Sequence, residues 1–230
     1  MSEECNCGCV SLPLIGDDAP AFQAETTNGP LNFPKDYKGK WVILFSHPAD
    51  FTPVCTTEFI TFANMADDFA KINVELIGLS IDSITSHIAW LKEIKDRIEY
   101  KGSKGVVVKF PVIADIKMDV AKKYGMIQPG VSDTKAVRAV FIIDPDAKIK
   151  AILYYPMSAG RNMEEIKRLV QALQVNYKDK VSTPANWQPG DDVVMGAPQT
   201  FKEAQERDSW TSDETKCCAS WFLVTKRCGK

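Results

Sequence analysis

One cysteine, Cys55, stands alone in the sequence, well away from the other cysteines. Thr52 and Pro53 precede it, and these residue types are typical of the N-cap and the first position of a helix. Counted from that cap, Cys55 falls in the first helical turn, where unpaired N–H groups and the helix dipole favour an anion. Thiols in such positions ionise more readily than a free cysteine. A cysteine with only a packing role is the ordinary alternative, but the local pattern predicts that Cys55 is a nucleophile.

The segments on either side of Cys55 are those that must hold it in place. Residues 41–46 are apolar and rich in β-formers, so we expect a buried strand there. After the cysteine, apolar side chains recur at helical spacing, at Phe59, Phe62, Ala63, Ala66, Phe69 and Ala70. A strand, a loop and a helix that begins near the cysteine are therefore expected.

Pro48, Thr52 and Cys55 also carry a family resemblance, because their spacing matches the Pro-x-x-x-Thr/Ser-x-x-Cys signature of the peroxiredoxins. The longer string from Phe45 to Glu58 resembles the one-cysteine peroxiredoxins, whose archaeal members carry extra C-terminal cysteines. The resemblance runs from about residue 14 to about residue 197. It implies a thioredoxin-like fold and the reduction of hydrogen peroxide and organic hydroperoxides to water or alcohols.

Strands and helices alternate along much of the remaining chain. Further strands are expected at 74–81, 109–114, 137–143 and 149–155. Helices are expected after Ser83, near Met118 and after Asn162, the first with Ile84, Ile88, Leu91, Ile94 and Ile98 on one face. This alternation predicts an α/β fold of three layers around a mixed sheet, which agrees with the thioredoxin-like fold that the resemblance implies.

The chain is expected to divide into three parts. Residues 1–10 are predicted to form a mobile tail and residues 11–176 the thioredoxin-like peroxiredoxin domain. Residues 177–230 are rich in turn formers and are expected to form a small, loop-rich appendage. The resemblance implies that this appendage serves in dimerisation and resolution, with Trp187, Trp210 and Trp221 as interface anchors. The alternative is that these tryptophans cover their own domain.

Two arginines are candidates to stabilise an anion at Cys55. Arg138 lies in an otherwise apolar strand, where a buried charge without a partner is costly, so an anionic partner at the strand end is expected. An edge-strand arginine in solvent is the alternative. Arg161 lies at a strand-to-helix turn, where an ordinary surface arginine is the alternative. The resemblance implies that both arginines serve the active site and that Arg138 binds the peroxide.

Thr52, Pro48 and His47 complete the candidate site. Thr52 can cap the helix and can also offer its hydroxyl to the thiolate or the peroxide. Pro48 would shield the site from water and fix the loop. His47 matches the active-site histidine of the subfamily, and it either donates a hydrogen bond to the peroxide or only packs.

Three further polar residues lie close to this stretch or follow it. Glu58 is expected to interact with the helix N-terminus or to orient an arginine, unless it is an ordinary first-turn acid. Asp50 is a weaker candidate for the same roles. His87 lies in the helix that follows Ser83 and is interpreted as a structural residue.

The expected reaction places the Cys55 thiolate on the distal oxygen of the peroxide and leaves a sulfenic acid. Cys218, Cys217 and Cys228 are the candidates to resolve it. The archaeal relatives carry two C-terminal cysteines separated by a short aromatic stretch, but here Leu223 occupies the expected second position. The alternative is reduction of Cys55 by an external thiol, which is either a thioredoxin-like protein or a small thiol.

No cofactor is expected, because thiol chemistry of this kind needs no haem, flavin or metal. Cys5, Cys7 and Cys9 are three thiols near the N-terminus with no fourth ligand close in sequence. Three such thiols are a weak pattern for zinc. We therefore predict no metal site.

The composition is that of an ordinary globular protein, with 45% hydrophobic and 25% charged residues in a chain of 230. A net charge of −2 gives no basic footprint for nucleic acid or for an anionic membrane. No apolar run reaches the roughly 20 residues that span a bilayer, and the acidic N-terminus lacks a signal-peptide pattern. We expect a cytoplasmic protein, since thiols stay reduced in that compartment.

The leading hypothesis is a thiol peroxidase that acts in antioxidant defence, as a homodimer or as a decamer built from a ring of dimers. A redox-switched chaperone or signalling protein, in which oxidation of Cys55 controls assembly, is the competing hypothesis. A thioredoxin-like dithiol oxidoreductase is disfavoured, because Cys55 has no partner in a Cys-x-x-Cys arrangement.

Overall fold

The computed structural model describes residues 12–227. Its contacts divide the chain into two compact units, with the boundary after Met163. Within the described range, every helix is too short or too polar to cross a membrane. The predicted features that lie outside this range are the tail at 1–10 and the thiols Cys5, Cys7, Cys9 and Cys228.

The first unit is built on a seven-stranded sheet with the order β2-β1-β7-β4-β3-β8-β9. Its strands are β1 (Phe22–Thr26), β2 (Gly29–Phe33), β3 (Trp41–Ser46), β4 (Val74–Ser80), β7 (Val112–Ala114), β8 (Arg138–Ile143) and β9 (Ile149–Tyr155). β3 runs parallel to β4 and β4 to β7, whereas the remaining pairs are antiparallel. The predicted mixed sheet is therefore confirmed.

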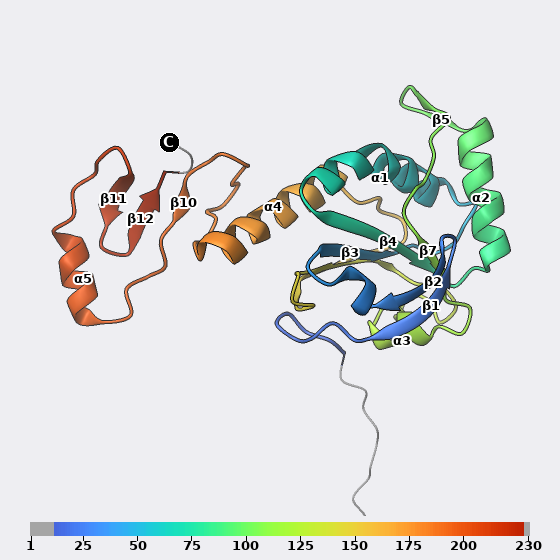
Figure 1. The fold of residues 1–230 in the computed structure, drawn as a ribbon, viewed down its shortest axis with the longest axis horizontal. Coiled ribbons are helices and arrows are strands. Elements are labelled where there is room, and N and C mark those ends of the chain that lie inside the picture. The colour runs from blue at the N-terminus through green and yellow to red at the C-terminus, as the bar shows by residue number, and fades with distance from the viewer. Residues whose placement is uncertain (1–11, 228–230) are drawn as a thin grey trace, which may run out of the picture. The chain divides into compact units, whose positions relative to one another are not determined.

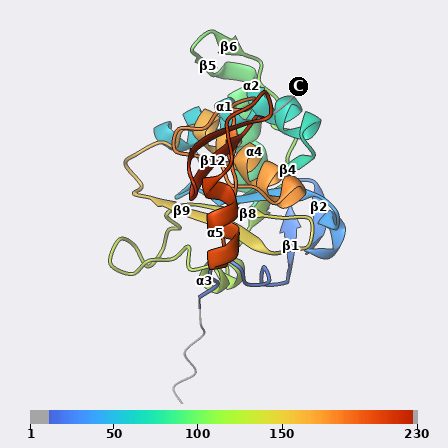
Figure 2. The same ribbon diagram turned by 90° about the vertical axis from the view of Figure 1, so that its left-hand side faces the viewer.

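Helices cover both faces of this sheet. α1 (Pro53–Lys71) and α2 (Ile84–Arg97) lie on one side and α3 (Asp119–Lys123) lies on the other, as Figures 1 and 2 show. The parallel strands β3, β4 and β7 follow one another across the sheet, so their right-handed connections place α1 and α2 on the same face. Short elements at the periphery are η1 (Lys35–Tyr37), β5 (Glu99–Tyr100) and β6 (Ser103–Lys104).

The centre of the sheet is apolar on both faces. Every residue of β3 and of β8 is buried, as expected for strands covered on two sides. The predicted strand at 41–46 is confirmed residue for residue. A turn at 144–147 joins β8 to β9, with Ala147 in the left-handed region at φ 61° and its N–H bonded to the Asp144 carbonyl.

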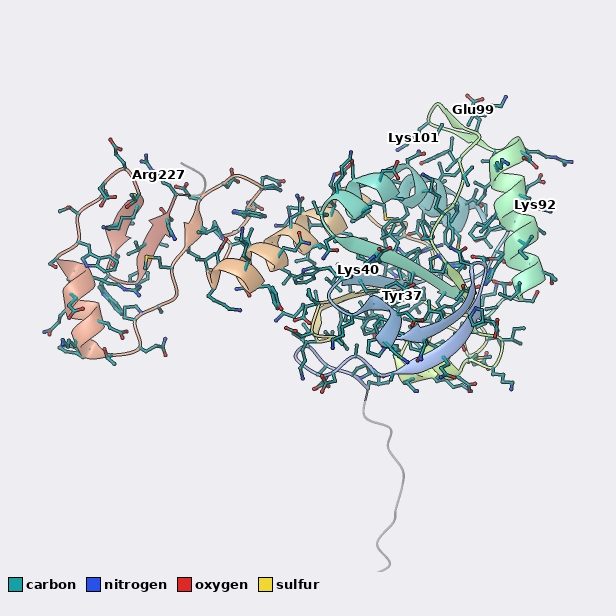
Figure 3. All side chains as sticks on the ribbon, in the orientation of Figure 1. Tyr37, Lys40, Lys92, Glu99, Lys101 and Arg227 are labelled. Carbon is teal, nitrogen blue, oxygen red and sulfur yellow. The ribbon has the colours of Figure 1, made fainter. Side chains whose placement is uncertain are left out.

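The inward face predicted for α2 is only partly right. Ile94 is buried as expected, but Ile88 is 42% exposed. The other buried residues of α2 are His87 and Trp90, while Lys92 lies on the outer side of the helix (Figure 3). The isoleucine spacing alone therefore misplaces part of the buried face of α2. His87 belongs to that face because its polar atoms are hydrogen-bonded, although its hydropathy would assign it to the surface.

The second unit, which begins at Glu164, is small and rich in loops. It holds most of α4 (Met163–Asp179), then β10 (Val193–Val194), α5 (Phe201–Asp208), β11 (Lys216–Ser220) and β12 (Leu223–Lys226). The three strands pair antiparallel in the order β10-β12-β11.

The tryptophans of this unit differ in exposure. Trp187 is 3% exposed and its indole N–H donates to the Asp191 carbonyl, so it packs within the unit. Trp221 is 42% exposed. The domain limits at 176 and 177, and the dimerisation role of this segment, stay predictions.

Candidate active site

Cys55 lies at the third position of α1, which begins at Pro53. Thr52 is the N-cap residue by position and has extended backbone angles, and the N–H of Thr56 closes the first turn on the Thr52 carbonyl. The side chain of Cys55 is fully buried. A sulfur in this first turn lies close to the positive end of the dipole of a 19-residue helix.

The side chain of Thr52 does not cap the helix, so this part of the prediction is wrong. Its hydroxyl instead donates to the carbonyl of Ala49 at 2.8 Å, within the loop between β3 and α1. The bond holds this loop in a tight turn, and Pro48, in the same loop, is buried. The oxygen of Thr52 keeps its lone pairs for a donor that enters the site.

Arg138 supplies the positive charge at the sulfur. It is the first residue of β8 and 2% exposed. Its Nη1 lies 3.3 Å from Sγ of Cys55 and 2.8 Å from Oε2 of Glu58. Its Nε and Nη2 both donate to the carbonyl of Met157, at 2.9 and 2.7 Å. A guanidinium held by a carbonyl and a carboxylate is fixed in place with one nitrogen directed at the sulfur.

Arg161 is buried nearby, but its bonds go to Glu58 and to the backbone. Its Nε and its backbone N–H donate to Oε1 of Glu58 at 2.9 and 2.8 Å, and Nη2 donates to Oε2 at 2.7 Å. Its Nη1 donates to the carbonyls of Ser46 and Ala139, each at 3.0 Å. Arg161 is therefore linked to Arg138 and to the sulfur through Glu58.

Glu58 joins the two arginines and is 3% exposed. Burial raises its pKa, but the charge and hydrogen bonds of Arg161, with the charge of Arg138, outweigh burial and hold the pKa below its ordinary value. Glu58 lies three residues after Cys55 and therefore on the same face of α1. That spacing is a usable signal in the sequence, and it agrees with the expectation that Glu58 orients an arginine.

Ser46 is a site residue that the sequence analysis missed. Its hydroxyl donates to the carbonyl of Val137 at 2.6 Å and accepts from the N–H of Ala139 at 3.1 Å. Ser46 thus joins the end of β3 to the start of β8, whose first residue is Arg138. Its position at the end of a buried strand, directly before the loop, was the only signal.

His47 and Asp50 are buried in the same loop and bond to each other. Nε2 of His47 lies 3.0 Å from Oδ1 of Asp50. Nδ1 of His87, on α2, lies 2.8 Å from Oδ2 of the same carboxylate. The ligand atoms of these three residues lie within 4.8 Å of one another, a spacing that a metal ion could bridge. Each imidazole nitrogen that faces Asp50 is also within hydrogen-bond distance of a carboxylate oxygen, so the three side chains form one hydrogen-bonded cluster.

The candidate resolving thiols lie in the second unit. Cys217 is exposed and Cys218 is partly buried, and both are free thiols. They are adjacent on β11, so their side chains point to opposite faces of the strand. Sγ of Cys218 lies 3.7 Å from the carbonyl of Thr211, at the long end of a weak S–H bond.

Stability at acid pH is expected to depend on Asp50 and Glu58. The pKa of each is held below its ordinary value of about 4 in the folded protein. The stabilisation is therefore complete above about pH 5 and is lost as the pH falls through the folded pKa values, by about 1.4 kcal/mol per pH unit for each group. Urea unfolding measured between about pH 6 and pH 2 should show this decline. A free energy of unfolding that stays level below about pH 4 would contradict it.

Two family profiles match the chain. The AhpC/TSA family covers residues 15–152, and the C-terminal domain of 1-Cys peroxiredoxin covers residues 172–208. A peroxiredoxin of Methanosarcina mazei is 65% identical over 216 residues, which are 94% of this chain and 98% of that protein. A peroxiredoxin of Aquifex aeolicus is 49% identical over 228 residues, covering 95% and 98%.

Solved structures agree with the sequence relatives. A yeast mitochondrial 1-Cys peroxiredoxin, studied for thiol resolution through glutathione and thioredoxin systems, has a TM-score of 0.78 at 39% identity, covering 94% of this chain and 100% of that one. Peroxiredoxin 6 of Arenicola marina has a TM-score of 0.77 at 36% identity, with coverage of 93% and 98%.

These likenesses, together with a buried cysteine at a helix N-terminus beside an arginine, define a thiol-dependent peroxidase on a thioredoxin-like fold. The chain belongs to the peroxiredoxin family, and its C-terminal part matches the one-cysteine type. The family and the fold that the resemblance implied are both confirmed.

Proposed function

We propose that Cys55 is the residue that reduces the peroxide. The observation that carries this assignment is the position of its sulfur, in the first turn of α1 and 3.3 Å from Nη1 of Arg138. The thiolate attacks the distal oxygen of the hydroperoxide, the S–O bond forms and the O–O bond breaks. Arg138 stabilises the charge that develops on the leaving oxygen, which takes up a proton and departs as water or an alcohol.

The other site residues have supporting roles in this proposal. The oxygen of Thr52 accepts from the hydroxyl of the hydroperoxide, while Pro48 excludes water from the loop. Arg161 and Glu58 act on Arg138, since their ion pairs fix its guanidinium in place. We include His47, which lies in the same loop, in the peroxide site.

The sulfenic acid on Cys55 is resolved by Cys217. Cys217 is the more exposed of the two described C-terminal thiols, and a disulfide with its neighbour Cys218 is disfavoured, because their side chains leave the strand on opposite faces. A thioredoxin-like protein or a small thiol then reduces the bridge, in line with the two reductants named for the yeast relative.

Peptide mapping after one equivalent of hydrogen peroxide tests the assignment of the resolving thiol. Non-reducing digestion should release a peptide pair joined by Cys55 and Cys217, and Cys217→Ser should remove it. A bridge to Cys218 or Cys228 would reassign the resolving residue. Cys55 oxidised with no bridge would instead show that an external thiol acts directly on the sulfenic acid.

The exposed sheet edge and the free thiols support proposals for the assembly and the cellular compartment of the enzyme. β9 is an edge strand of the sheet, and its Tyr154 is 43% exposed. Such an edge is available to pair with a second copy, which supports a homodimer, with a decameric ring of dimers as the larger form. Reactive free thiols need a reducing compartment, so the enzyme acts in the cytoplasm in antioxidant defence.

A further inference from the structure

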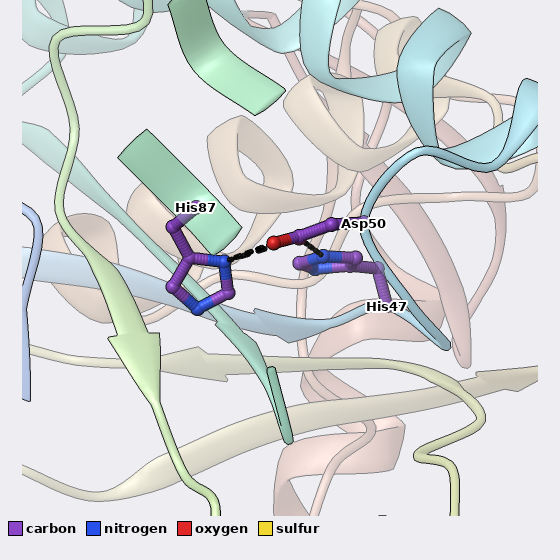
Figure 4. A group of neighbouring side chains, drawn as sticks. All are labelled: His47, Asp50 and His87. Carbon is purple, nitrogen blue, oxygen red and sulfur yellow. Dashed lines mark hydrogen bonds and ion pairs between the residues drawn. The ribbon is translucent and has the colours of Figure 1, made fainter. Parts of the chain in front are cut away.

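A hydrogen-bonded cluster of two imidazoles and one carboxylate lies beside the loop that leads to Cys55 (Figure 4). His47 and Asp50 belong to that loop, and His87 lies in the first turn of α2. Both imidazoles are fully buried and Asp50 is 6% exposed. These are the only two histidines in the chain. The reaction proposed above gives no role to His87.

The hydrogen bonds of His87 fix its protonation. Its Nε2 lies 3.1 Å from the carbonyl of Ile113, which can only accept, so Nε2 carries a hydrogen. Its Nδ1 lies 2.8 and 3.0 Å from the two oxygens of Asp50. If Asp50 is ionised, Nδ1 carries a hydrogen as well. His87 is then an imidazolium ion.

Asp50 has the surroundings of an ionised carboxylate. It accepts from the hydroxyl of Ser86 at 2.8 Å in addition to the two imidazoles. Burial raises the pKa of Asp50, but the hydrogen bonds of His47 and His87 are the first causes that oppose it, and the pKa is held well below its ordinary value. The carboxylate therefore faces three donors and keeps its charge at neutral pH.

His47 is left neutral, with one free acceptor. Burial lowers the pKa of His47 and outweighs the opposing effect of Asp50, and the charge of His87 lowers it further. A neutral imidazole carries one hydrogen, which must lie on Nε2, because Nε2 faces the carboxylate of Asp50. Nδ1 then carries only a lone pair. It is buried and has no hydrogen-bond partner within residues 12–227.

The remaining neighbours of the cluster do not change the assignment of His47 as the neutral imidazole. The rings of Phe59 on α1 and Trp90 on α2 pack on His47, with centroids 4.7 and 5.2 Å away. The other charged group beside the cluster is Asp82, in the loop after β4, whose carboxylate accepts from the N–H of Asp50 and the hydroxyl of Ser80. Its negative charge, like that of Asp50, raises the pKa of His47, but burial outweighs both and the pKa stays below its ordinary value.

We propose that His87 is a positioning residue of the peroxidase, an imidazolium that acts through Asp50 to keep His47 neutral, with Nδ1 as a hydrogen-bond acceptor. This rests on the place of His47 in the peroxide site proposed above. In this state His47 accepts a hydrogen bond at the peroxide site and does not donate one, because an Nδ1 without hydrogen can bind only a donor. As an acceptor, Nδ1 can take a hydrogen bond from the peroxide that the Cys55 thiolate attacks.

NMR of the two imidazoles tests the protonation states without any measurement of activity. In ¹⁵N-histidine-labelled Cys55→Ser protein at about pH 7, one imidazole should show two protonated nitrogens and the other a protonated Nε2 with a bare Nδ1. With only two histidines in the chain, His47→Gln or His87→Asn assigns both signals. A neutral His87, or a hydrogen on Nδ1 of His47, would overturn the proposal even if Cys55 is confirmed as the peroxidatic residue.

The pH dependence of Cys55 oxidation tests the functional consequence. In His87→Asn an amide still donates to Asp50 but the positive charge is lost, so the pKa of His47 should rise. The second-order rate constant with hydrogen peroxide should then fall about tenfold at about pH 6 relative to the parent and recover at about pH 8. Ser86→Ala is the matched control, because it removes an uncharged donor to Asp50, and it should leave the pH profile unchanged. An equal loss of rate at every pH in His87→Asn would show a purely structural role and overturn the proposal.

Discussion

Replacing Cys55 by serine is expected to abolish the stoichiometric consumption of hydrogen peroxide by the pre-reduced protein. The serine hydroxyl is nearly isosteric, but it does not ionise near neutral pH and is a poor nucleophile without an adjacent base. The second-order rate constant should therefore fall by about 10³-fold or more. Peroxide loss is measured over a single turnover with no added reductant.

The C-terminal thiols provide the matched controls for this prediction. Cys217→Ser and Cys218→Ser change free thiols of the second unit and leave the contact between Cys55 and Arg138 in the first unit unaltered. Both variants should retain the fast first turnover of the parent. Equal peroxide consumption by Cys55→Ser and the parent would show that another thiol performs the chemistry.

Replacing Glu58 by glutamine is expected to destabilise the fold strongly. The carboxylate accepts four hydrogen bonds, three from Arg161 and one from Arg138, in a setting where all three side chains are at most 3% exposed. Glutamine keeps the shape but leaves two buried guanidinium groups without their counter-charge. Removing one partner of a buried ion pair costs about 3–5 kcal/mol. Urea unfolding at neutral pH measures this loss.

An exposed ion pair of the same type gives the comparison. Glu165 and Arg168 on α4 are bonded at 2.6 Å, but their side chains are 42% and 22% exposed. Glu165→Gln should cost less than about 1 kcal/mol, because water screens the pair. If Glu58→Gln were as mild as Glu165→Gln, the buried carboxylate would not hold the two arginines as described.

The elements that carry Cys55 were predictable because their signals are local. β3 is a continuous apolar run, Pro53 is suited to the first position of α1, and both elements form where the pattern places them. The turn between β8 and β9 likewise follows from Asp144 and its neighbours. In each case residues a few positions apart decide the structure.

The partners of the buried polar groups were not predictable in the same way. Thr52 bonds to the Ala49 carbonyl instead of capping, and Arg161 bonds to Glu58, 103 positions away. Sequence spacing identifies a charge that must be satisfied, but not the atom that satisfies it. His87 shows the same limit, since its burial depends on Asp50 and Ile113, which belong to other elements.

The most direct measurement of the central claim is to trap the sulfenic acid. A variant with Cys217, Cys218 and Cys228 changed to serine is treated with one equivalent of hydrogen peroxide and dimedone, then digested and analysed by mass spectrometry. The dimedone adduct should appear on the peptide that contains Cys55 and not on the peptide with Cys5, Cys7 and Cys9. Consumption of the peroxide with Cys55 left unmodified would contradict the assignment of Cys55 as the peroxide-reducing thiol.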